Sequence, residues 1–147
     1  MTTLRSRLAA TVLFSLAATG AMADDTLPYD NGVVVNVTSI RTEPGQFNNY
    51  LRYLAGPYRQ IMDEAKAQGL IIDYGHYSTQ PKTPGDPNLY TIVTYENFAA
   101  LDGLSEKMAA ISAKVFGSMA EAEKSQAERE SLRKVIGSER LQKLELH

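Results

Sequence analysis

Residues able to do acid, base or metal chemistry are scarce in this sequence. The chain has no cysteine and two histidines, and one of these, His147, is the last residue. No thiol can therefore act as a nucleophile or metal ligand, and no histidine cluster can hold a metal ion. The glycine-rich and HExxH patterns that bind phosphates, dinucleotides or zinc are also missing from the sequence. We therefore predict neither a metal site nor a cofactor.

His76 is the one internal side chain whose ordinary pKa lies near neutral pH. It belongs to a strand-like segment, and alternate side chains of a strand share one face. If the mixed faces of neighbouring strands align, one cavity between two sheets is lined by Asn36, Thr38, Tyr74, His76, Thr94 and Glu96. We predict that these six residues bind a small polar or aromatic ligand.

Two interpretations of these six residues remain open. In the first, they form a binding site, or a hydrogen-bonded polar layer in a dimer interface that needs no ligand. In the second, the protein is a cofactor-independent monooxygenase- or isomerase-like enzyme, with His76 as general base and Asn36 or Tyr74 holding the substrate oxyanion. A hydrogen bond between His76 and Glu96 would favour the second, because a carboxylate fixes the imidazole tautomer and raises its basicity.

The strands that position these residues are indicated by β-branched and aromatic segments. Residues 70–77 and 89–96 flank a loop rich in Pro and Gly, which predicts an antiparallel pair at the centre of the fold. Residues 33–40 predict a first strand with an apolar face (Val33, Val35, Val37) and a mixed face (Val34, Asn36, Thr38, Ile40). Residues 139–146 predict a charged last strand at an edge of the sheet.

Helical spacing of apolar residues separates these strands. From Phe47 to Ala65 such residues recur every three or four positions, which predicts a helix capped at Thr42, kinked at Gly56-Pro57 and ended by Gly69. Four aromatic residues of this helix are assigned to the core and to an interface rather than to a ligand-stacking box: Phe47, Tyr50, Tyr53 and Tyr58.

Two further helices follow the second strand pair. Asn97 is predicted to cap a helix that ends near Gly117, and Ser118 to cap a charged helix that runs to about Val135. The charged helix is expected to close a dimer, cover the mouth of a cavity or dock another protein.

The predicted fold class is α+β, with the ferredoxin-like order βαββαβ and an additional C-terminal helix. Such an antiparallel four-stranded sheet carries its helices on one face only. We expect the other face to be buried against a copy of the same chain, which predicts a homodimer.

The N-terminal 23 residues have the three parts of a secretory signal peptide. Arg5 and Arg7 precede a short apolar run, and Ala21-Met22-Ala23 fits a cleavage site, so we expect cleavage after Ala23 and a periplasmic or secreted protein. Residues 24–32 are predicted to be a flexible tether and residues 33–147 one domain. Cleavage leaves 13 basic against 17 acidic residues, a net charge of −4. This balance argues against nucleic acid or an anionic membrane as the partner.

The segments 41–47, 65–69 and 89–100, in this layout, resemble the dimeric α/β-barrel superfamily. The resemblance covers about residues 33–146. It implies two ferredoxin-like sheets that face each other in a dimer, with one cavity per subunit. Members include antibiotic-biosynthesis monooxygenases, haem-degrading monooxygenases and chlorite dismutases.

The sequence departs from the haem-binding members of that superfamily. The haem-degrading members have an Asn on the first strand, a His on the second helix and a Trp. Asn36 matches the first of these positions, but residues 98–115 contain no His and the chain contains no Trp. His76 does not match the proximal His of the haem-ligating members. The resemblance therefore implies a fold and a dimer more than an activity.

Overall fold

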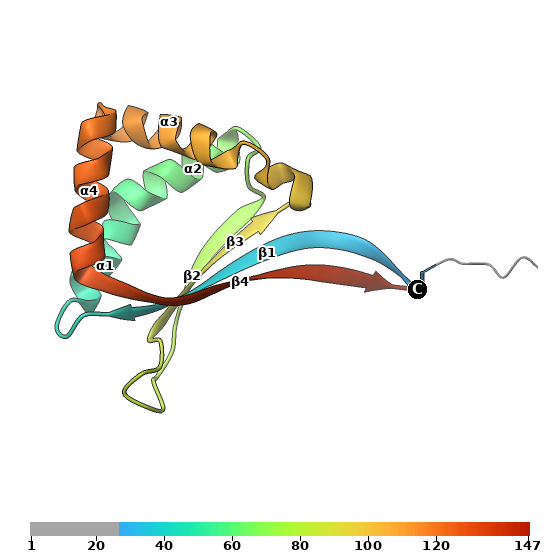
Figure 1. Ribbon diagram of the computed structural model, residues 1–147, viewed down its shortest axis with the longest axis horizontal. Coiled ribbons are helices and arrows are strands. Elements are labelled where there is room, and N and C mark those ends of the chain that lie inside the picture. Colours follow the sequence, from blue (N-terminus) through green and yellow to red (C-terminus); the bar gives the residue numbers. More distant parts are fainter. Residues whose placement is uncertain (1–26) are drawn as a thin grey trace, which may run out of the picture.

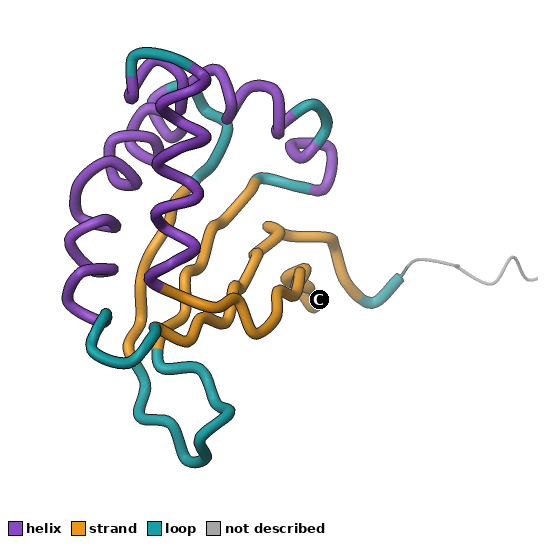
Figure 2. The backbone as a smooth tube through the Cα atoms, turned by 60° about the vertical axis from the view of Figure 1, so that its left-hand side comes forward, coloured by secondary structure: helices purple, strands orange, loops and turns teal. Residues whose placement is uncertain are grey.

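The computed structural model describes residues 27–147, which form an α+β fold (Figures 1 and 2). The predicted signal peptide, residues 1–23, lies outside the described residues. The elements follow in the order β1 (Tyr29–Thr42), α1 (Phe47–Tyr53), a π-helical turn (Leu54–Tyr58), α2 (Arg59–Ala67), β2 (Asp73–Ser78), β3 (Leu89–Tyr95), a 3-10 turn (Phe98–Leu101), α3 (Leu104–Phe116), α4 (Met119–Leu132) and β4 (Arg133–Leu146). The predicted α+β class is confirmed, and the arrangement is compatible with a ferredoxin-like fold.

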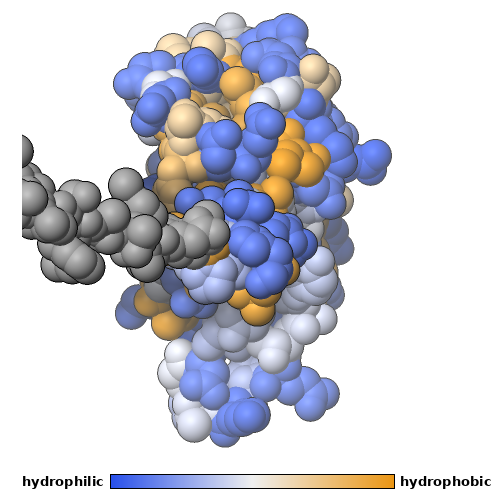
Figure 3. Space-filling model, turned by 90° about the vertical axis from the view of Figure 1, so that its right-hand side faces the viewer, coloured by the Kyte–Doolittle hydropathy of each residue, from blue (hydrophilic) through white to orange (hydrophobic). Residues whose placement is uncertain are grey.

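The four strands form one antiparallel sheet in the order β2-β3-β1-β4. β4 lies at an edge, as its charges predicted. The predicted pair of β2 and β3 also forms, but only β3 is central, and β2 is the second edge. The loop that joins them, residues 79–88, projects from the foot of the molecule (Figure 1), where Figure 3 shows hydrophilic and neutral surface below hydrophobic patches.

β1 and β4 form a ribbon that runs on beyond the helices (Figure 1). β1 begins at Tyr29, opposite Leu146, so part of the segment predicted as a tether (24–32) is strand. β4 likewise begins at Arg133, without a loop after α4. The charged helix was predicted to run to about Val135, but α4 ends at Leu132 and residues 133–138 belong to β4. Residues 30–32 and 137–138 are poor strand formers, and the strand here is stabilised by pairing of the two backbones.

The first helical segment starts later than predicted. Thr42 ends β1 instead of capping a helix, since it exchanges hydrogen bonds with Asn88: Thr42 N donates to Asn88 Oδ1 at 3.0 Å, and Asn88 Nδ2 donates to Thr42 Oγ1 at 2.7 Å. α1 begins after Gln46. The predicted kink is confirmed at Gly56-Pro57, where the proline lacks an N–H and the chain forms the π-helical turn.

The helix boundaries after β3 follow the capping residues. Asn97 Oδ1 accepts a hydrogen bond from Ala100 N, but this caps the short 3-10 turn, and α3 begins only at Leu104. Ser118 Oγ accepts from Glu121 N and starts α4, as predicted. No described helix is long and apolar enough to cross a membrane.

The helices pack on the mixed face of β1, which corrects the expectation that this face lines a cavity between two sheets. Strand register places Thr38, Thr91 and His76 side by side, and the core clusters take Ile40, Leu89 and Val93 from the same face. The apolar face of β1 is therefore the one that the described helices leave uncovered (Figure 2). The pattern of one strand could not settle this, because both of its faces carry apolar residues.

Candidate functional site

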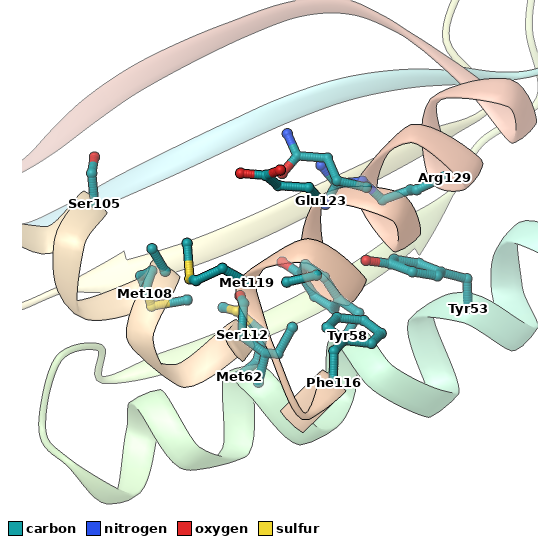
Figure 4. Close-up of a pocket in the computed structure, with 14 residues that line it drawn as sticks. Tyr53, Tyr58, Met62, Ser105, Met108, Ser112, Phe116, Met119, Glu123 and Arg129 are labelled. Carbon is teal, nitrogen blue, oxygen red and sulfur yellow. The ribbon is translucent and has the colours of Figure 1, made fainter. Parts of the chain in front are cut away.

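The helix layer contains a partly open cavity of about 500 Å³, which we call the helix cavity. Figure 4 shows Met62, Met108 and Met119 from three different helices at one end, with Tyr53 and Arg129 at the other. Its lining comes from α1, the π-helical turn, α2, α3 and α4: Tyr53, Tyr58, Ile61, Met62, Ser105, Met108, Ala109, Ser112, Phe116, Met119, Ala122, Glu123, Gln126 and Arg129.

Residue spacing on α4 explains how the helix cavity is built. Met119, Ala122, Gln126 and Arg129 follow one another at steps of three, four and three residues, so they form one stripe along the helix. The facing stripe of α3 carries the small side chains Ala109 and Ser112. Small residues on both helices leave space where larger ones would meet.

Below the helix cavity lies a second, smaller space of about 160 Å³, which we call the arginine pocket. It lies between the sheet and the helices, and Tyr58 and Arg129 line both spaces. The arginine pocket is lined by Thr38, Ile40, Tyr50, Tyr58, Thr91, Arg129 and Arg133. Except for Ile40, every one of these side chains carries a polar group.

Two guanidinium groups give the arginine pocket its charge. Arg133 is only 8% exposed, and its Nη2 donates to Glu130 Oε1 at 2.9 Å. Arg129 Nη2 donates to the same oxygen at 3.4 Å. Among the described residues, neither Arg129 Nε nor Arg133 Nε has a hydrogen-bond partner, although both atoms are buried. Each guanidinium also lies over a tyrosine ring, Arg129 on Tyr53 at 5.8 Å and Arg133 on Tyr50 at 5.7 Å.

The tyrosines of the arginine pocket are neutral hydrogen-bond donors at physiological pH. Burial raises the pKa of Tyr50, although the nearby Arg133 and Arg129 charges work against the shift. Burial also raises the pKa of Tyr58 far above its usual range. Both hydroxyls therefore keep their protons and can donate to an acceptor in the pocket.

His76 and Tyr74 line a third space of about 400 Å³ at the β2 edge, which we call the edge pocket. The His76 ring lies 5.4 Å from the Tyr58 ring and 6.0 Å from the Tyr74 ring, measured between centroids. Tyr74 donates a hydrogen bond of 2.6 Å from its hydroxyl to Asp63 Oδ1, and burial with this bond raises the pKa of Tyr74 to about 12. Burial lowers the pKa of His76, so its ring is neutral near pH 7.

The six residues predicted to line one cavity are divided between the two faces of the sheet. Asn36, Thr38, Tyr74 and His76 share the helix-covered face, with Asn36 Nδ2 donating to Thr38 Oγ1 at 3.2 Å. Thr94 has the opposite orientation, and Glu96 is exposed beyond the end of β3. Of the six, Thr38 lines the arginine pocket and Tyr74 and His76 line the edge pocket.

The structure gives His76 a threonine as its polar neighbour instead of Glu96. His76 Nδ1 lies 3.3 Å from Thr91 Oγ1, its partner in the strand register. Glu96 is five residues farther along β3, a separation of about 16 Å in an extended strand. The carboxylate that would have oriented and activated the imidazole is therefore not in reach. In the described part of the chain, no group of three or more His, Asp or Glu residues could hold a metal ion.

Arg129 and Arg133 are the site residues that the sequence analysis missed. The signal for Arg129 was the α4 stripe, which it continues from Met119 and Ala122, whereas Arg133 is the first residue of β4 and had no such signal. Of the aromatics assigned to the core, Tyr50 is buried in a core cluster and also lines the arginine pocket, and Tyr53 and Tyr58 line the helix cavity.

Comparisons with known proteins give one similar structure. The chain matches no protein-family model and no curated protein. The crystal structure of HapK from Hahella chejuensis is similar, with 11% sequence identity and a TM-score of 0.48, over 75% of this chain and 91% of HapK.

Proposed function

We propose that this protein binds a small, mainly apolar molecule in the helix cavity. The observation that carries the proposal is the cavity itself, about 500 Å³ of space lined by Met, Phe, Tyr and Ile side chains, with polar groups distributed along it and Arg129 at one end. Ligand sites in proteins commonly have volumes of about 300 to 1,000 Å³ and this mixture of apolar walls and a few polar groups. Met62, Met108 and Met119 are flexible and can adapt to the shape of a ligand.

Binding is better supported than catalysis by His76. A general base needs an orienting partner and access to the substrate proton. The neighbour of His76 is the Thr91 hydroxyl, and its burial makes the ring a weaker base by lowering its pKa. The enzyme interpretation thus lacks the carboxylate that would have favoured it.

The proposal includes assembly as a homodimer of the dimeric α/β-barrel type. The described helices leave Val35, Val37 and Ile92 on the face of the sheet that they do not cover. A second copy is the occupant we propose, because a two-fold axis brings the same apolar patch of both subunits together. In this arrangement each subunit keeps its own helix cavity.

We also propose that binding takes place outside the cytoplasm. The support is the signal-like pattern of residues 1–23, with cleavage after Ala23. Export would leave a periplasmic or secreted protein of negative net charge, with neither a membrane nor a nucleic acid as its partner.

A pair of neighbouring alanines on α3 tests the binding proposal. Ala109 lines the helix cavity, whereas Ala110 is exposed. Ala109→Phe should fill the cavity and abolish binding of the apolar fluorescent probe N-phenyl-1-naphthylamine, and Ala110→Phe should leave binding unchanged. Circular dichroism checks that both variants are folded. Equal binding by the two variants, or no binding by the parent protein, would contradict the proposal.

A further inference from the structure

We infer that the arginine pocket is the head-group end of the ligand site, and that the ligand is a monoanionic carboxylic acid with an apolar body. The inference rests on the proposed binding function and adds the chemical class of the ligand. The apolar body would occupy the helix cavity, and the carboxylate would lie between Arg129 and Arg133.

The first support is the pair of buried guanidinium N–H groups without partners. Arg133 is more than nine-tenths buried and lines the pocket, and Nε of both arginines is buried and makes no hydrogen bond to any described residue. A buried donor without a partner destabilises the folded protein. A carboxylate in the arginine pocket would place a charged acceptor beside both guanidinium groups, and a guanidinium is suited to bind two carboxylate oxygens side by side.

The second support is the balance of charge. The two arginines share one carboxylate, that of Glu130, through its Oε1 atom. Two positive groups and one negative group leave a net charge of one, which matches a monoanion better than a doubly charged phosphate ester. Cation–π contacts to Tyr50 and Tyr53 hold the guanidinium groups in place without neutralising them.

The third support is that the two spaces are neighbours. Tyr58 and Arg129 line both, so a molecule that extends from one to the other would contact these two side chains. The hydroxyls of Tyr50 and Tyr58 are protonated donors on the same pocket, and Thr38 and Thr91 add hydroxyls from the sheet. Polar groups therefore surround the arginine pocket, where the carboxylate of an amphipathic acid would lie.

Titration calorimetry with octanoate and octanamide tests this inference on the purified protein. The two probes have the same apolar tail and differ in charge. The parent protein should bind octanoate at least about tenfold more tightly than octanamide, because only the carboxylate forms charged hydrogen bonds with both guanidiniums. Arg133→Met should remove this preference and leave octanamide affinity unchanged. Arg52→Met, which removes an exposed arginine of α1, is the matched control and should keep the preference.

Arg129→Met provides a second variant at a less buried position, should Arg133→Met fail to fold by circular dichroism. It should also weaken octanoate binding selectively. Equal affinity of the parent protein for both probes would overturn the carboxylate inference but leave the binding proposal standing. Binding of neither probe would overturn both, and an unchanged octanoate preference in a folded arginine variant would overturn the assignment of the head-group site.

Discussion

His76 and Arg133 are both shielded from solvent, but burial affects their charges differently. An imidazole can lose its proton, so desolvation lowers the pKa of His76 and leaves it neutral near pH 7. A guanidinium keeps its charge in proteins. Arg133 therefore stays charged and needs an anion, and Glu130 is shared with Arg129. This contrast is why the arginines, and not the histidine, form the centre of the proposed site.

The neutral state of His76 predicts a pH dependence of stability. Because its folded pKa is below the unfolded value of about 6.5, the unfolded chain binds more protons as the pH falls through that value. The contribution of His76 to the free energy of unfolding is fully present above the unfolded pKa, and it is lost as the pH falls toward the lower pKa of the folded state. His76→Gln should reduce the difference in free energy of unfolding between about pH 7.5 and pH 5.5, measured with urea.

His147→Gln is the control for this measurement, because it removes the other histidine, whose side chain is 56% exposed. The His76 variant should lose more of the pH dependence than this control. Equal slopes for the His76 variant and the parent protein would show that burial does not disfavour the charged imidazole.

At the scale of elements, the end of α2 shows how a single backbone position directs the chain into the sheet. Gly69 has a φ of +69°, and Leu70 N and Gly69 N donate to Ala65 O and Lys66 O. These two hydrogen bonds form the Schellman motif, which ends the helix and places Leu70 against the core.

Substitution of Gly69 by alanine should cost about 1 kcal/mol of unfolding free energy, because the left-handed conformation disfavours a Cβ atom. A Cβ atom at Gly69 would meet nothing within 4 Å, so the backbone alone is responsible. Gly85→Ala is the matched control: its surroundings are equally open and its φ is not positive. Urea unfolding should show no loss for Gly85→Ala. Similar losses for both variants would contradict the conformational explanation.

The sequence predicts which helices and strands form better than it predicts which face of each strand is buried. Strand pairing, the Gly56-Pro57 kink and the Ser118 cap follow from local chemistry and were predicted. The face of β1 that the helices cover depends on all four strands together. Val34 and Val35 lie on opposite faces of β1 and are both apolar, so neither face is marked as the buried one. The arginine pocket combines residues 38, 50, 58, 91, 129 and 133, which no local pattern brings together. His76 was found from its residue type, but its neighbour Thr91 required the strand register.

At the scale of the whole molecule, the proposed dimer depends on the uncovered face of the sheet. Val37→Glu would place a charge in the middle of that face, and burying it between two subunits should weaken the dimer about a hundredfold or more. Native mass spectrometry at decreasing protein concentration measures the loss. Ala127→Glu adds the same charge to an exposed position of α4 and should leave the dimer intact. A parent protein that is monomeric, or a Val37 variant that dimerises normally, would contradict the proposed interface.

The central claim, a ligand in the helix cavity, is tested most directly by NMR of methionine methyl groups. After residue 22, the methionines of the chain are Met62, Met108 and Met119, and all three line the cavity. Their ¹³C-labelled methyl signals can be assigned by substituting each in turn with leucine, and then followed during titration with octanoate. The account predicts that all three signals shift together and saturate at one ligand per chain. Unchanged signals at saturating octanoate, with the protein folded, would contradict it.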